Sequence, residues 1–244
     1  MSKKNKKQQP DKSKELLIVG AVALVLVIVV IILAIALPGT PTDTTACTDP
    51  NHDHSHDHSH EQTEATQHQG SGDGATLETA QATHYVTMEI ADYGTIKAEL
   101  YGNTAPKTVQ NFVELAQKGY YNGLNFHRII EGFMMQGGAP GADSEPVASI
   151  NGEFTDNGFT NNLLHLRGVL SMARTSDPNS ASSQFFIIHQ DSPHLDGQYA
   201  AFGMVTEGMD VVDAVCTAAE PTDGNGAIAE DARPVITSLT VTEA

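Results

Sequence analysis

The chain has 244 residues, of which 40% are hydrophobic, and a formal net charge of −17. This length allows one or two domains with a substantial hydrophobic core. The acidic balance argues against nucleic-acid binding, which needs a basic surface patch. Residues 1–15 differ from the rest because they contain six lysines, and a basic head on an acidic body indicates that the two parts face different surroundings.

An uncharged apolar segment follows this basic head. Residues 16–37 consist mostly of Val, Ile, Leu and Ala. As a helix they would measure about 33 Å, which is enough to cross a hydrocarbon core of about 30 Å. A cleaved signal peptide stays an alternative, because the motif at 34–36 has the small residues of a cleavage site. We predict a single-pass signal anchor in the plasma membrane, with residues 1–15 in the cytoplasm and the remainder outside.

Residues 38–83 form a polar stretch that we predict to be a disordered linker, because it cannot bury enough apolar surface to offset the entropy of ordering. Imidazoles interleaved with carboxylates can bind borderline metals such as zinc, nickel or copper(II). Structural metal sites usually draw their ligands from a fold, so labile metal binding and a solvated spacer both stay open. The candidate ligands occupy every second position: His52, His54, His56, His58 and His60.

Residues 84–244 have the pattern of a folded domain. The runs 85–90 and 95–101 alternate around a turn and predict a hairpin. Thr104 supplies a capping hydroxyl and Pro106 suits the first turn of a helix that follows. Short strands with two helices favour a closed barrel over a parallel sheet. Further strands are expected at 168–172, 184–189, 200–205 and 235–241, and a second helix at 209–216.

The stretch 125–138 has the sequence NFHRIIEGFMMQGG. It contains two apolar runs around Glu131 and Gly132, and the pattern predicts a tight turn there. Arg128 lies among apolar neighbours, with Gln136 nearby in sequence. A guanidinium on an apolar floor is costly unless it has partners, and one such partner could be a ligand carbonyl.

Three more blocks follow this stretch: GVLSMA at 168–173, SQFFI at 183–187 and HLDGQYAAFG at 194–203. Together the four blocks resemble the cyclophilin-type peptidyl-prolyl cis-trans isomerases, in the family's order. The resemblance implies a mainly β fold, with a closed eight-stranded antiparallel barrel capped by two helices. With the predicted anchor it implies a bacterial membrane-anchored form that acts on proline-containing unfolded or exported polypeptides. It also implies a monomeric catalytic domain.

The reaction of that family rotates the bond before proline, and it requires no cofactor because no bond breaks. The resemblance implies that Arg128 donates to the prolyl nitrogen, Phe133 helps to receive the proline ring, and Gln136 holds a substrate carbonyl. Arg174, His194 and Tyr199 stand where the best-known eukaryotic members carry asparagine, tryptophan and histidine. The implied substrate-binding positions are Phe126, His127, Met134, Ala173, Arg174, Gln184, Phe186, His194, Leu195, Tyr199 and Phe202.

Two other functions stay open from the sequence. The domain can be a non-catalytic module that holds proline-containing segments, or the chain can be a metal-handling surface protein in which the histidines of the linker matter. Ser171 and Ser183 lie in strand-like runs without a G-x-S-x-G elbow, so no hydrolase triad is inferred.

Overall fold

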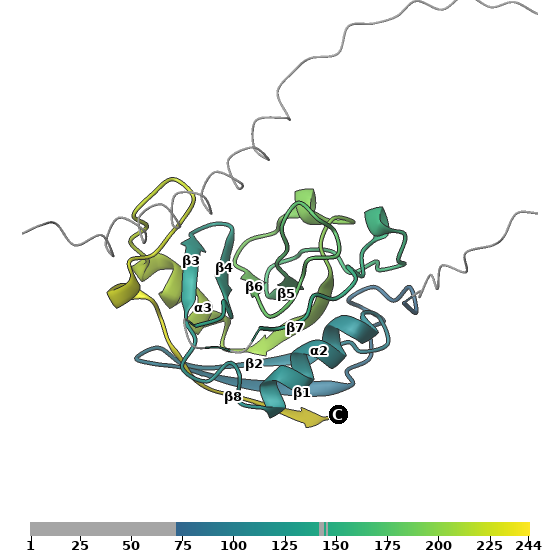
Figure 1. The fold of residues 1–244 in the computed structure, drawn as a ribbon, viewed down its shortest axis with the longest axis horizontal. Helices are drawn as coiled ribbons and strands as arrows, with labels where there is room; N and C mark the ends of the chain where they lie inside the picture. The colour runs from purple at the N-terminus through teal and green to yellow at the C-terminus, as the bar shows by residue number, and fades with distance from the viewer. Residues whose placement is uncertain (1–71, 142–143, 145) are drawn as a thin grey trace, which may run out of the picture. The chain divides into compact units, whose positions relative to one another are not determined.

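The computed structural model describes residues 72–141, 144 and 146–244. These residues form one antiparallel sheet of eight strands in the order β3-β4-β6-β5-β7-β2-β1-β8, with two α-helices, α2 (Pro106–Gln117) and α3 (Met209–Ala218) (Figure 1). The mainly β prediction is therefore confirmed. The strands are β1 (His84–Ile90), β2 (Gly94–Leu100), β3 (Phe126–Ile130), β4 (Met134–Gly137), β5 (Val169–Met172), β6 (Phe185–Ile188), β7 (Ala201–Glu207) and β8 (Ile236–Glu243).

The sheet curls into a half-barrel. A bulge bends the strand that contains it and increases the local twist, and register shifts of this kind interrupt the β1–β8, β2–β7, β3–β4 and β5–β7 pairings. The end strands β3 and β8 meet through the segment before β3, where Asn125 forms an isolated bridge with Val235 and Phe126 N donates to Pro234 O at 2.9 Å. Ile236 adds two backbone hydrogen bonds, accepting from Gly123 N and donating to Leu124 O, both at 2.8 Å. The predicted closed barrel is therefore present as a curled sheet without a continuous closing ladder.

An aromatic group fills the inner face of the sheet. The Phe112 ring of α2 lies 5.0 Å from Tyr121, 5.3 Å from Phe185 and 5.3 Å from Phe202, measured between centroids. Phe126 joins this group at 6.0 Å from Phe185. Both Phe126 and Phe202 are 0% exposed within the main core. Both rings pack against the inside of the sheet, and their contact with substrate stays a prediction.

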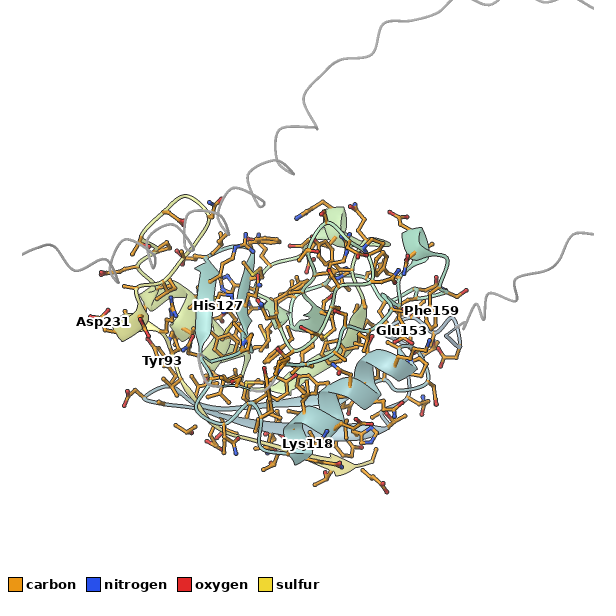
Figure 2. All side chains as sticks on the ribbon, viewed as in Figure 1. Tyr93, Lys118, His127, Glu153, Phe159 and Asp231 are labelled. Atoms are coloured by element: carbon orange, nitrogen blue, oxygen red, sulfur yellow. The ribbon has the colours of Figure 1, made fainter. Side chains whose placement is uncertain are left out.

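The N-terminus of α2 is capped by a distant residue. Glu153 is 1% exposed and accepts hydrogen bonds from Lys107 N (3.0 Å) and Thr108 N (2.8 Å), beside the start of the helix (Figure 2). The Thr104 hydroxyl, predicted to cap the helix, instead donates to Asp73 Oδ1 at 2.9 Å. A carboxylate at this position satisfies two N–H groups without helical partners and is stabilised by the helix dipole.

The described part begins inside the predicted linker. Leu77 and Ala80 pack against buried residues of the folded domain, and Thr83 N donates to Leu100 O at 2.8 Å. Residues 72–83 therefore belong to the folded unit, which corrects the predicted boundary at 83/84.

The anchor at 16–37 and the histidines His52 to His60 lie outside the described residues, so both stay predictions. Among the described residues, no helix is long and apolar enough to cross a bilayer. The same part of the chain holds no group of three or more metal-ligating side chains.

Replacing Glu153 by alanine tests the distant cap. The substitution leaves two N–H groups of α2 without acceptors in a buried setting, so we expect the free energy of unfolding to fall by about 3 kcal/mol in urea denaturation. The matched control is Thr108→Val, because the Thr108 hydroxyl has no partner among the described residues. The control is expected to change stability by less than about 1 kcal/mol. Equal losses in the two variants would contradict the cap.

Candidate active site

A bulge in β3 places Arg128 on the face of the sheet opposite the core. In a regular strand, residues two apart share a face. Here the register shifts between Phe126 and Arg128, so that His127 is the extra residue. Phe126 and Ile129, three positions apart, are both 0% exposed and both belong to the main core. The bulge therefore directs Arg128 away from the core that its neighbours fill.

Neutral partners hold the Arg128 guanidinium. Its Nε donates to the carbonyl oxygen of Asn225 at 2.7 Å, and its Nη1 donates to Gln136 Oε1 at 3.3 Å. Nη1 also lies 3.8 Å from the sulfur of Met134. Gln136 is fixed in turn, since its Nε2 donates to Gln184 Oε1 at 2.9 Å. Among the described residues, no carboxylate oxygen lies within 4.0 Å of this guanidinium.

The electrostatic setting keeps Arg128 a cation. Burial lowers the pKa of Arg128, while the charges of Tyr199 and Asp223 act in the opposite direction. An arginine stays protonated at neutral pH even when its pKa is lowered. The site therefore presents a fixed positive charge that no neighbouring carboxylate neutralises by direct contact.

Asn225 is a site residue that the sequence did not reveal. Its turn is shaped by Asp223, whose Oδ1 accepts from Asn225 N (2.9 Å) and Ala227 N (3.0 Å). Gly226 has a φ of +86°, and a Cβ there would lie 2.7 Å from the Ile129 carbonyl oxygen. Gly226 O accepts from Ile129 N at 2.8 Å, so the turn docks directly on β3. The Asn225-Gly226 pair predicts a turn from the sequence. It does not show that the Asn225 carbonyl contacts Arg128.

A second apolar cluster lies beside Arg128, separate from the main core. The rings of Phe133 and His194 are 5.3 Å apart, and Phe186 meets Tyr199 edge-on at 5.8 Å. The cluster is therefore an aromatic and aliphatic surface next to the cation. The structure brings together here six of the predicted positions: Phe133, Met134, Ala173, Phe186, Leu195 and Tyr199.

A buried hydrogen-bond chain supports this surface. Asp196 Oδ1 lies 2.9 Å from His165 Nδ1, and His165 Nε2 lies 3.0 Å from Ser171 Oγ. The His165 ring stacks on Phe186 with centroids 6.2 Å apart. Burial lowers the pKa of His165, against the opposing influence of Asp196. The order of groups resembles a hydrolase triad, but Ser171 is 0% exposed and cannot meet a substrate, so the chain holds Phe186 in place.

One hollow of the described residues does not coincide with this surface. It measures about 310 Å³ and lies beside α2. Its lining contains none of the predicted site residues. The residues around it are Lys107, Gln110, Asn111, Glu114, Ile150 and Asn151.

His127 lies on β3 next to Arg128 (Figure 2). Its Nδ1 is buried and has no partner among the described residues. Burial, followed by the positive charges of Arg233 and Arg128, lowers the pKa of His127 to about 4. The ring is therefore neutral at neutral pH. The structure places it beside the cation but outside the second apolar cluster.

Acid should destabilise the fold through His127. An unfolded histidine has a pKa of about 6.5, so the unfolded state binds more protons between pH 6.5 and 4, and stability falls as pH falls through this window. From pH 7.5 to pH 5 we expect His127 to remove about 2 kcal/mol from the free energy of unfolding. His127→Gln should lack this part of the pH dependence in urea titrations at both pH values. An identical pH dependence in wild type and variant would contradict the assignment.

The sequence was compared with family models and with known proteins. Residues 85–241 match the family model described as cyclophilin type peptidyl-prolyl cis-trans isomerase/CLD. A peptidyl-prolyl cis-trans isomerase of Acinetobacter baylyi is 40% identical over 157 residues, covering 62% of this chain and 82% of the relative. Peptidyl-prolyl cis-trans isomerase-like 2 of Gibberella zeae is 41% identical over 146 residues, which are 59% of this chain but only 25% of that protein.

The solved structures agree with the sequence matches. A cyclophilin-type peptidyl-prolyl cis-trans isomerase of Cryptosporidium parvum, crystallised in the presence of the dipeptide Ala-Pro, is 29% identical with a TM-score of 0.55. The likeness covers 66% of this chain and 99% of that one. The family match, the relatives and the curled eight-stranded fold agree, and the chain belongs to the cyclophilin-type peptidyl-prolyl cis-trans isomerase family.

Proposed function

We propose that the chain accelerates rotation of X-Pro bonds in exported polypeptides, with Arg128 as the catalytic cation. The observation that carries this proposal is a guanidinium held by neutral groups beside an apolar cluster in which Phe133, Ala173 and Tyr199 are only partly buried. A non-catalytic module would need the apolar surface to hold a proline ring, but it would not need a fixed cation. The relatives named as peptidyl-prolyl isomerases also favour an enzyme over a non-catalytic module.

The reaction needs no covalent step. Resonance in the peptide bond sets a rotation barrier of about 18–20 kcal/mol. A cation that donates to the prolyl nitrogen localises its lone pair, which removes part of that resonance. The partners of Arg128 fix its guanidinium before the substrate arrives. The guanidinium can therefore stabilise the twisted amide of the transition state more than the planar amide of the ground state.

The neighbours of Arg128 have complementary tasks. Phe133, Met134 and Phe186 offer an apolar surface that fixes the proline ring while the preceding carbonyl turns. Gln136 uses one N–H of its amide on Gln184 and retains a second for a substrate carbonyl. The Cryptosporidium parvum relative was crystallised with Ala-Pro, which supports a proline-containing peptide as the ligand.

Substitution of Arg128 tests the enzyme hypothesis. We expect Arg128→Ala to lower kcat/KM for an X-Pro peptide by about 100- to 1000-fold in the full chain, because the principal transition-state donor is lost. Lys118→Gln, a remote charge removal on the C-cap of α2 (Figure 2), should leave the rate unchanged. Acceleration that persists in Arg128→Ala would overturn the mechanism. No acceleration by a folded wild type would support the binding module instead.

We also propose that residues 16–37 anchor the chain in the plasma membrane, with the folded domain outside the cytoplasm. The length and apolar composition of the segment and the lysines before it support this orientation. Such a tether would keep the domain near exported chains as they emerge. Weak metal binding by the histidines of the linker stays a separate hypothesis, and deletion of residues 52–60 should not change the isomerisation rate.

Cys47 offers a direct test of the orientation. The other cysteine, Cys216, is 1% exposed, and burial raises the pKa of its thiol to about 12, so it should not react. A membrane-impermeant thiol reagent should therefore label intact cells through Cys47, and Cys47→Ser should abolish the label. Labelling only after lysis would contradict the orientation. Recovery of a shortened, soluble chain would support the cleaved signal peptide.

A further inference from the structure

Arg174 follows β5 and is fixed in one orientation. Its guanidinium carbon lies 4.6 Å from the centroid of the Tyr199 ring and 5.1 Å from that of Phe154. Nε and Nη2 donate to the carbonyl oxygen of Gln198 at 3.0 and 2.8 Å, and Nη1 donates to Thr175 O at 2.9 Å. Two aromatic contacts and three hydrogen bonds therefore hold the side chain before any ligand arrives.

Two donors of Arg174 remain without a partner among the described residues. A guanidinium has five N–H groups, and the three hydrogen bonds above leave one free N–H on each terminal nitrogen. Two such groups can bind both oxygens of one carboxylate, which is a strong, directional interaction. Among the described residues, no carboxylate oxygen lies within 4.0 Å of Arg174.

Two of the seven lysine and arginine side chains in the described part of the chain contact a carboxylate, and Arg174 is among the five that do not. Lys97 contacts Glu207 at 2.8 Å, and Arg167 contacts Asp213 at 2.7 Å. Arg128 is also free of a carboxylate, but its donors are directed to Asn225 and Gln136 within the site. Arg174 is therefore a second site cation, and the carbonyls that orient it do not neutralise its charge.

Tyr199 connects Arg174 with the surface that would receive proline. One contact of its ring is with the Arg174 guanidinium, and another is the edge-on packing against Phe186 at 5.8 Å. An extended peptide advances about 3.3–3.6 Å per residue, so two residues span about 7 Å. A side chain one or two residues from a proline on Phe186 can therefore reach the Arg174 fork.

We propose that Arg174 selects client segments that have a carboxylate side chain within two residues of the proline. This inference rests on the proposed isomerase function and adds the chemical class of its preferred substrates. The net charge of −17 repels acidic peptides at long range, so the preference comes from the local contact with Arg174.

A peptide series tests the selection. The probes are Ala-X-X-Pro-X-X-Ala peptides in which one X at a time is Glu, Gln or Lys and the others are Ala, with exchange rates measured by NMR on the full chain. At one of the X positions we expect kcat/KM for the Glu peptide to exceed that for the Gln peptide by about three- to tenfold at low salt. The Lys peptide should have the lowest kcat/KM at that position. The ratio should fall towards one at an ionic strength of about 0.5 M, where exposed charges are screened.

Two variants assign the effect to its residue. In Arg174→Gln the Glu/Gln ratio should fall to about one, whereas Lys118→Gln, which removes the same charge elsewhere, should keep the wild-type ratio. Because both peptides are measured on the same variant, a merely structural role of Arg174 would lower both rates and leave the ratio unchanged.

The outcomes separate this inference from the proposed function. A wild-type ratio of one at every position, or an unchanged ratio in Arg174→Gln, would overturn the selection while acceleration of the Gln peptides still supports the isomerase. Failure to accelerate any peptide would overturn both.

Discussion

The rest of the site depends on one constraint: a half-buried cation must be held without being neutralised. Arg128 meets it by donating to the Asn225 carbonyl at 2.7 Å and to the Gln136 amide oxygen at 3.3 Å, with no carboxylate of the described residues in contact. A carboxylate partner would stabilise the side chain more strongly, but it would compete with a substrate for the charge. The bulge at His127 and the close approach of Gly226 to β3 follow from this constraint, because they place the guanidinium and the carbonyl that holds it.

The two faces of the sheet have different roles: the inner face packs the core that stabilises the fold, and the other face forms the candidate site. On the inner face, aromatic rings around Phe112 form a core that excludes water and supports the curvature of the strands. On the other, the buried Phe186 packs against the partly exposed Tyr199, and His165 stacks against Phe186. The hydrogen bonds that His165 makes with Asp196 and Ser171 satisfy both ring nitrogens beneath this surface and keep its shape.

Much of the fold was predictable because its signals are local. The hairpin of β1 and β2, the apolar stripe of α2 and the turn at Gly132 follow from periodicity and turn residues, and the structure confirms them. The site blocks were found through family resemblance, which does not say on which face a residue lies. Phe126 and Arg128 are an example, since a one-residue bulge decides that they do not share a face. The Glu153 cap and the Asn225 carbonyl could not be predicted, because each depends on a contact between distant segments.

The most direct test is a structure of the full chain with a bound Ala-Pro-containing peptide. We predict that the proline ring lies on Phe133 and Phe186 and that a terminal N–H of Arg128 points to the prolyl nitrogen. The hydrogen bond from Arg128 Nε to the Asn225 carbonyl should persist. A peptide bound with its proline on this surface but with Arg128 turned away from the prolyl nitrogen would contradict the catalytic role. So would a peptide seated elsewhere on the domain, such as in the hollow beside α2.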